Sequence, residues 1–209
     1  MKKTFLLIAI ALSLGIRSHA QEIQTVFRGG RVTGWGALTN KFTTLNGEFA
    51  NIAGVYGGVY FNQKFFLGIE GSGVTNDISV LPQYSVDPAR NLSYAYGQCG
   101  LVTEYALGSN KAIHAVFHLF TGAGLTVQYN RYHWDDDPDD GDDYNPEDHD
   151  ENWFFVAEPG VQLEVNMFRW MRFSPGVTYR KAMGSTSKGL SDDSLSDWSY
   201  NITLKFGKF

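Results

Sequence analysis

The sequence contains very little of what stabilises small disulfide-rich or helical membrane proteins. Its only cysteine, Cys99, excludes a framework of intramolecular disulfides. Beyond the first twenty residues, no stretch approaches the ~18 consecutive apolar residues that a transmembrane helix needs. A basic stripe and an RNA-binding motif are also missing, so nucleic acid is not an expected partner. If the mature chain crosses a membrane, it must do so with strands.

The beginning of the chain has the pattern of a segment that is removed on export. Lys2 and Lys3 precede the apolar stretch 5–16, which is too short to span a bilayer, and small residues lead to a cleavage position after Ala20. We therefore expect a cleaved secretory signal peptide over 1–20 and a single domain over 21–209.

Alternation with a period of two predicts strands in the second half of the chain. Apolar residues occupy every other position over 113–129, and polar or small residues lie between them. The same separation recurs over 155–166, 171–180 and 198–207. Successive side chains of a strand point to opposite faces, so each segment has one apolar and one polar face. Less regular segments over 29–39, 49–61, 65–70 and 92–105 complete eight strand candidates.

Short turns and longer polar connections alternate along these candidates. The expected turns are Phe61–Phe65, Leu107–Lys111 and Met167–Trp170, and the expected loops are 40–47, 75–91, 130–152 and 184–197. This rhythm is typical of a membrane barrel with short periplasmic turns and long extracellular loops. The predicted fold is all-β, an eight-stranded antiparallel transmembrane up-and-down β-barrel. A soluble exported β-sandwich or lipid carrier is the alternative, and it would turn the apolar face inward.

The polar face of such a barrel is its interior, which is just wide enough for side chains to fill. Charges there need partners, because an isolated charge away from water is costly. We predict a lumen charge network of Arg31, Glu70, Glu104, Glu158, Glu164, Arg172, Arg180 and Lys205. His114 and His118 face the same way, and we expect them to form hydrogen bonds near Glu104 or Gln128.

Two prolines lie inside predicted strands, although proline lacks the donor that a sheet ladder requires. Pro159 and Pro175 both occur as Pro-Gly-Val, on either side of the turn at Met167–Trp170. Folding about that turn brings them roughly opposite each other. We predict a shared bulge or bend on this hairpin.

An acidic segment is the strongest local signal. Eleven carboxylates occur between residues 134 and 151, within the expected loop 130–152. The simplest interpretation is a solvated loop extended by self-repulsion. A loosely bound divalent cation is the alternative, although Pro138 breaks the calcium-loop spacing. Candidate Ca²⁺ ligands are Asp136, Asp140, Asp142 and Glu147. No other cofactor and no catalytic residue is predicted.

With its strands placed, the chain resembles the small eight-stranded outer-membrane β-barrel proteins of Gram-negative bacteria. Its terminal segment Phe206–Phe209 is similar to the C-terminal aromatic signal of such families, although Phe209 is out of phase with Phe206. The resemblance implies residence in the cell outer membrane among lipid and lipopolysaccharide. It also implies insertion by the barrel-assembly machinery through this C-terminal segment.

The resemblance does not imply one activity, because such families include anchors, adhesins, channels and enzymes. The first hypothesis is a non-enzymatic structural or surface-binding scaffold with a plugged polar lumen, whose loops bind an extracellular ligand. A narrow, porin-like channel for small or apolar solutes is the second, and it requires an open interior. A lipid-modifying outer-membrane enzyme is the third, but no short Ser/His motif lies at a lipid-facing strand end.

Overall fold

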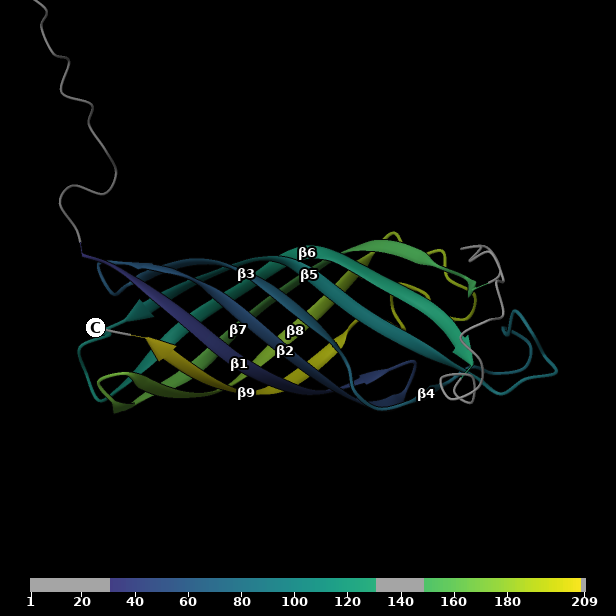
Figure 1. Ribbon diagram of the computed structural model, residues 1–209, viewed down its shortest axis with the longest axis horizontal. Coiled ribbons are helices and arrows are strands. Elements are labelled where there is room, and N and C mark those ends of the chain that lie inside the picture. The colour runs from purple at the N-terminus through teal and green to yellow at the C-terminus, as the bar shows by residue number, and fades with distance from the viewer. Residues whose placement is uncertain (1–30, 131–148, 208–209) are drawn as a thin grey trace, which may run out of the picture. The chain divides into compact units, whose positions relative to one another are not determined.

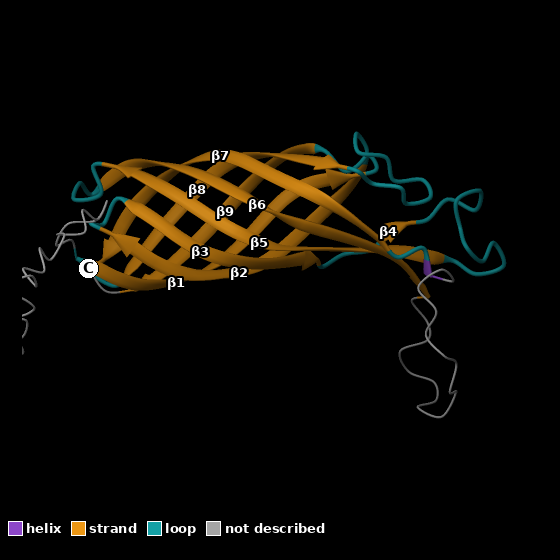
Figure 2. Cartoon of the chain, turned by 90° about the horizontal axis from the view of Figure 1, so that it is seen from above, coloured by secondary structure: helices purple, strands orange, loops and turns teal. Residues whose placement is uncertain are grey.

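Eight long antiparallel strands form a closed barrel in the computed structural model, which describes residues 31–130 and 149–207 (Figure 1). They are β1 (Val32–Leu45), β2 (Glu48–Phe61), β3 (Phe65–Val74), β5 (Leu92–Leu107), β6 (Ile113–Asn130), β7 (Asn152–Phe168), β8 (Met171–Met183) and β9 (Asp197–Gly207). Each long strand pairs with the next along the chain, and β1 pairs with β9 to close the ring. A two-residue strand, β4 (Ile78–Ser79), pairs with β5 near one mouth of the barrel (Figure 2).

The predicted fold class is confirmed, including the three short turns between β2 and β3, β5 and β6, and β7 and β8. The expected boundary after residue 20 lies outside the described residues. No helix in the described part of the chain is long and apolar enough to cross a membrane.

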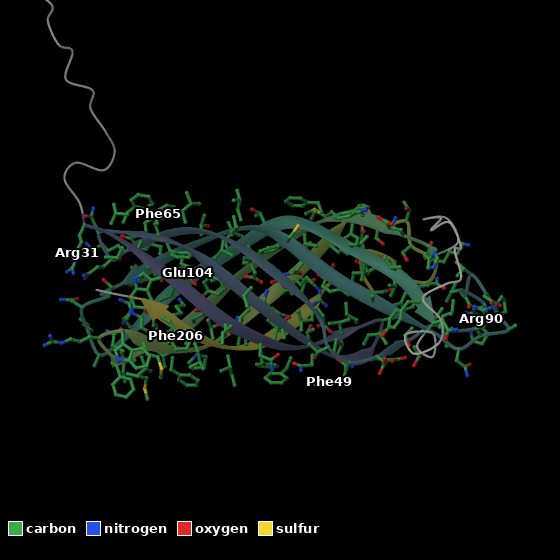
Figure 3. The ribbon with its side chains drawn as sticks, in the orientation of Figure 1. Arg31, Phe49, Phe65, Arg90, Glu104 and Phe206 are labelled. Carbon is green, nitrogen blue, oxygen red and sulfur yellow. The ribbon has the colours of Figure 1, made fainter. Side chains whose placement is uncertain are left out.

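The predicted inward and outward faces are also confirmed. Even-numbered side chains of β6, β7 and β8 are buried inside the barrel, whereas their odd-numbered neighbours are more exposed, and β9 has the reverse parity. Outward-facing Phe117, Leu119, Val161 and Ile202 are between 40 % and 52 % exposed. The apolar face therefore covers the outside of the barrel, which excludes the soluble lipid-carrier arrangement. Phe49, Phe65 and Phe206 can be followed on this outer face in Figure 3.

The expected loop over 40–47 was wrong, because β1 continues to Leu45. Only Asn46 and Gly47 form the connection, and Leu45 pairs directly with Glu48. Both turn residues have positive φ, 53° and 79°. These values suit a two-residue hairpin turn of the Asn-Gly type, which matches the twist of the flanking strands. The first connection at the loop end is therefore tight rather than long.

The two prolines do not produce the predicted bulge. The β7–β8 register is constant over 157–166, although pairing is interrupted opposite Pro159 and Pro175. The one register shift of this hairpin lies between Asn166 and Phe168, beside the turn. On their other sides both prolines occupy regular positions, opposite β6 and β9. Proline lacks only its own N–H, so the ladder loses bonds on one side while the strand continues.

Candidate functional site

Near the turn end of the barrel, one lysine lies between two glutamates in the interior. Nζ of Lys205 is 2.8 Å from Oε2 of Glu104 and 2.8 Å from Oε2 of Glu164. A second cation, Arg172, places Nη1 2.6 Å from Oε1 of Glu164. These four side chains are at most 1 % exposed. Two carboxylates and two cations therefore compensate each other where water is excluded. Figure 3 labels Glu104 within the outline of the barrel.

Hydroxyl and imidazole groups form further hydrogen bonds with the same glutamates. The hydroxyls of Tyr56 and Tyr60 donate to the carboxylate of Glu104 at 2.9 and 2.6 Å. Nδ1 of His118 lies 3.2 Å from Oε1 of Glu104, as its predicted neighbourhood requires. His114 instead contacts Glu164, with 2.9 Å between Nε2 and Oε1. Each carboxylate oxygen of Glu104 and Glu164 therefore has two partners among hydroxyl, imidazole and cationic groups.

A separate network lies further towards the loop end and depends on Lys41. Its Nζ is 2.7 Å from Oε1 of Glu70 and 2.5 Å from Oε2 of Glu158, with all three side chains nearly inaccessible. Sequence reasoning missed Lys41 because it ended the strand at residue 39. The signal was present, since Lys41 continues the odd-numbered inward face of Trp35, Ala37 and Thr39.

The remaining predicted lumen cations lie in different places. Arg180 is buried, but its hydrogen bonds go to backbone carbonyl groups. Nε donates to the carbonyl oxygen of Leu195 at 2.6 Å and Nη2 to that of Thr44 at 2.8 Å. Arg31 does not belong to the interior network, because its side chain is exposed and precedes the first residue of β1. A position before the strand has no fixed inward face, so parity could not place it.

The β8–β9 loop folds into the mouth of the barrel. Leu190 and Leu195 are only 2 % and 1 % exposed and belong to the apolar cluster of the barrel interior. Between them and β8, Gly189 has φ +79°, and a Cβ there would lie 2.6 Å from the ring of Tyr84. Apolar side chains of this loop are therefore buried at the mouth, and the loop packs closely against its neighbours.

Two aspartates fix this loop. Oδ2 of Asp150 accepts hydrogen bonds from Ser187 Oγ and Lys188 N, both at 2.8 Å, and from Gln128 Nε2 at 3.2 Å. The backbone N–H groups of Gly184 and Ser185 donate to the carboxylate of Asp192 and hold its pKa below the usual value. Because the folded-state pKa is the lower one, this stabilisation is present at neutral pH and is lost as the pH falls through that value.

We expect Asp150→Gly to release the β8–β9 loop. Glycine suits the positive φ of this residue, 49°, so the change removes the carboxylate without straining the backbone. Loss of hydrogen bonds to a charged acceptor should raise trypsin cleavage after Lys188 about tenfold, as expected for ~1.4 kcal/mol. Asp193→Gly is the matched control, since that carboxylate is 95 % exposed. Equal cleavage rates in the two variants would contradict the role of Asp150.

The candidate cation ligands Asp136, Asp140, Asp142 and Glu147 lie outside the described residues. Elsewhere, within 31–130 and 149–207, no group of three or more His, Cys, Asp or Glu side chains could hold a metal ion. His114 and His118 contact glutamates, and the serine nearest to this network, Ser174, donates to Glu164. The described interior therefore holds an ion-pair network rather than a serine–histidine arrangement.

Comparisons with known proteins connect this barrel to solved structures. No family model and no curated protein matches the sequence. Neisserial surface protein A is similar with a TM-score of 0.60 at 6 % identity, covering 87 % of this chain and 99 % of that one. The N-terminal β-barrel domain of Pseudomonas aeruginosa OprF has a TM-score of 0.54 at 9 % identity, covering 85 % and 98 %. The chain has the fold of the small eight-stranded outer-membrane β-barrels.

Proposed function

We propose that this protein is a non-enzymatic barrel of the bacterial outer membrane, with a plugged lumen and extracellular loops that bind a ligand. The observation that carries the proposal is the set of charged and apolar side chains buried in the interior. Lys41 and Lys205 each join two buried glutamates, and Leu190 and Leu195 cover the loop end. An eight-stranded barrel is narrow enough for such side chains to close it.

The loop over 75–91 is the best supported binding element. Its base is tied to β2, since Ser79 N donates to Glu48 Oε2 at 3.1 Å. Its tip is organised by Asp87, whose Oδ1 accepts from Ala89 N at 3.0 Å. Leu81 and Tyr84 nevertheless stay 49 % and 38 % exposed. A loop with an ordered backbone and exposed apolar side chains binds at a lower entropic cost than a mobile one.

The outer surface supports a membrane location. Aromatic side chains cluster at the turn end, where the rings of Phe168 and Trp170 stack with centroids 5.6 Å apart and Trp170 stacks on Phe206 at 6.2 Å. Such girdles lie at the membrane interface of outer-membrane barrels. Phe206 faces outward, as the proposed recognition by the barrel-assembly machinery requires. Fractionation of cell envelopes should recover the protein with the outer membrane.

Lipopolysaccharide is the proposed neighbour at the loop end, in contact through shared divalent cations. The described residues at this end carry more carboxylates than cations, so direct contact with anionic lipopolysaccharide would be repulsive. Calorimetric titration of the protein with Ca²⁺ tests for bound divalent cations. The absence of binding heat would contradict the proposed cation-mediated contact. Mass spectrometry of lipid A from cells with and without the protein tests the enzymatic alternative.

Purified protein in planar bilayers is expected to give no stable single-channel steps. The reason is that ion flow would require separating charge pairs that are buried away from water. Heat-modifiable mobility on gels verifies that the reconstituted protein is folded. Reproducible conductance steps from folded protein would contradict the scaffold hypothesis and favour the narrow channel.

A further inference from the structure

The charged side chains of the described residues fall into three groups along the barrel. Four glutamates and four cations are buried in the interior. The loop end has eight carboxylates and three cations, whereas the turn end has four cations and, within 31–130 and 149–207, no carboxylate. Figure 3 shows Arg31 at one end and Arg90 at the other. We call the four cations of the turn end the basic rim: Arg31, Lys64, Lys111 and Arg169.

The backbone of the basic rim is fixed from strand to strand. All four side chains are exposed. Lys64, Lys111 and Arg169 belong to short connections and Arg31 directly precedes β1, and the backbone at each of these places bonds to a neighbouring strand or turn. Asn62 N donates to Arg31 O at 2.9 Å, Ala106 N to Lys64 O at 2.8 Å, Asn166 Nδ2 to Lys111 O at 2.7 Å and Gly207 N to Trp170 O at 2.9 Å. The cations therefore project from a rigid ring and not from long loops, which lowers the entropic cost of binding.

Aromatic side chains set the depth of the basic rim. Lys64 directly precedes outward-facing Phe65, and in the sequence Arg169 separates Phe168 from Trp170, whose rings stack on each other. Aromatic residues of this kind lie where the acyl chains meet the head groups. The adjacent cations are then at the level of the lipid phosphates.

We propose that the basic rim binds the head groups of anionic phospholipids. The proposal rests on the membrane location given above and adds the lipid class that this end of the barrel selects. Lysine and arginine donate charge-assisted hydrogen bonds to phosphate oxygens, and arginine can do so with two parallel bonds. The acidic loop end lacks this complementarity, so the two rims of the barrel differ in the lipid that they retain.

Lipid selection can be measured by electron paramagnetic resonance. The mature chain is placed in phosphatidylcholine bilayers with trace spin-labelled phosphatidylglycerol or spin-labelled phosphatidylcholine. We expect phosphatidylglycerol to be preferred next to the protein, by about fivefold at a site beside one cation. The preference should fall towards unity in the triple variant Lys64→Gln, Lys111→Gln, Arg169→Gln. In the unaltered chain it should also fall at ~1 M salt, where the screening length is only ~3 Å.

The loop end provides a matched control. The triple variant Arg90→Gln, Lys181→Gln, Lys188→Gln removes the same charge and should keep the preference of the unaltered chain. Free glycerol phosphate at the concentration of the labelled lipid should not compete. The proposal is overturned if the unaltered chain shows no preference, if both triple variants lose it equally, or if glycerol phosphate abolishes it. None of these outcomes bears on conductance or envelope fractionation, so the proposed function would stand.

Discussion

Lys41→Met is expected to lower the free energy of unfolding by about 3–5 kcal/mol. The side chain of Lys41 bonds directly to both Glu70 and Glu158, and both carboxylates are buried. Removing it leaves two buried negative charges facing each other across the interior. Urea unfolding of the protein in lipid vesicles, followed by tryptophan fluorescence, measures the loss.

The control for this change is Lys181→Met, which removes a partly exposed lysine paired at 3.4 Å with an exposed aspartate. It should cost less than about 1 kcal/mol, because exposed ion pairs contribute little. Adding Glu70→Gln to Lys41→Met should recover part of the lost stability. Similar costs for Lys41→Met and Lys181→Met would show that the interior pair is not what holds the barrel together.

Gly122→Ala is expected to destabilise the barrel by about 3 kcal/mol, at the upper end of what overpacking costs. Gly122 of β6 pairs with Gly100 of β5, and both face inward. A Cβ at residue 122 would lie 2.1 Å from the carbonyl oxygen of Cys99 and 2.6 Å from Cα of Gly100. Backbone atoms cannot rotate away as a side chain can, so the two strands would have to separate.

Gly71→Ala is the matched control, because nothing lies within 4 Å of the Cβ it would add on the outer face of β3. It should be neutral or slightly stabilising, since alanine restricts the unfolded chain. The same unfolding assay compares the two variants. A loss in Gly71→Ala as large as that in Gly122→Ala would mean that glycine content, and not close strand approach, sets the cost.

Closure of the barrel depends on such glycines at two places. Gly58 pairs with Gly68 in the same way, and a Cβ at residue 58 would lie 2.1 Å from the carbonyl oxygen of Leu67. Glycines without side chains let strands bend and coil sharply enough to complete a small ring. The sequence shows these glycines, but only the pairing register identifies which of them face each other.

The sequence by itself determined the faces of the clearly alternating segments over 113–129, 155–166, 171–180 and 198–207, and the outward position of their apolar side chains. Each of these follows from alternation within one segment, because a side chain's face depends on its own strand alone. Positions outside that alternation were not determined, as the exposed Arg31 shows. The Asn46-Gly47 turn also depends on local sequence alone, because an Asn-Gly pair is typical of a two-residue hairpin turn and indicates a short first connection.

Only the tertiary structure decided which charges meet and where the β8–β9 loop packs. Lys41 joins Glu70, 29 residues away, and Glu158, 117 residues away. The height of a side chain inside a barrel depends on the stagger of all the strands, which parity does not contain. The positions of Leu190 and Leu195 likewise depend on the interior side chains against which they pack. The local residue pattern therefore predicts the barrel, whereas the strand register determines which side chains meet in its interior.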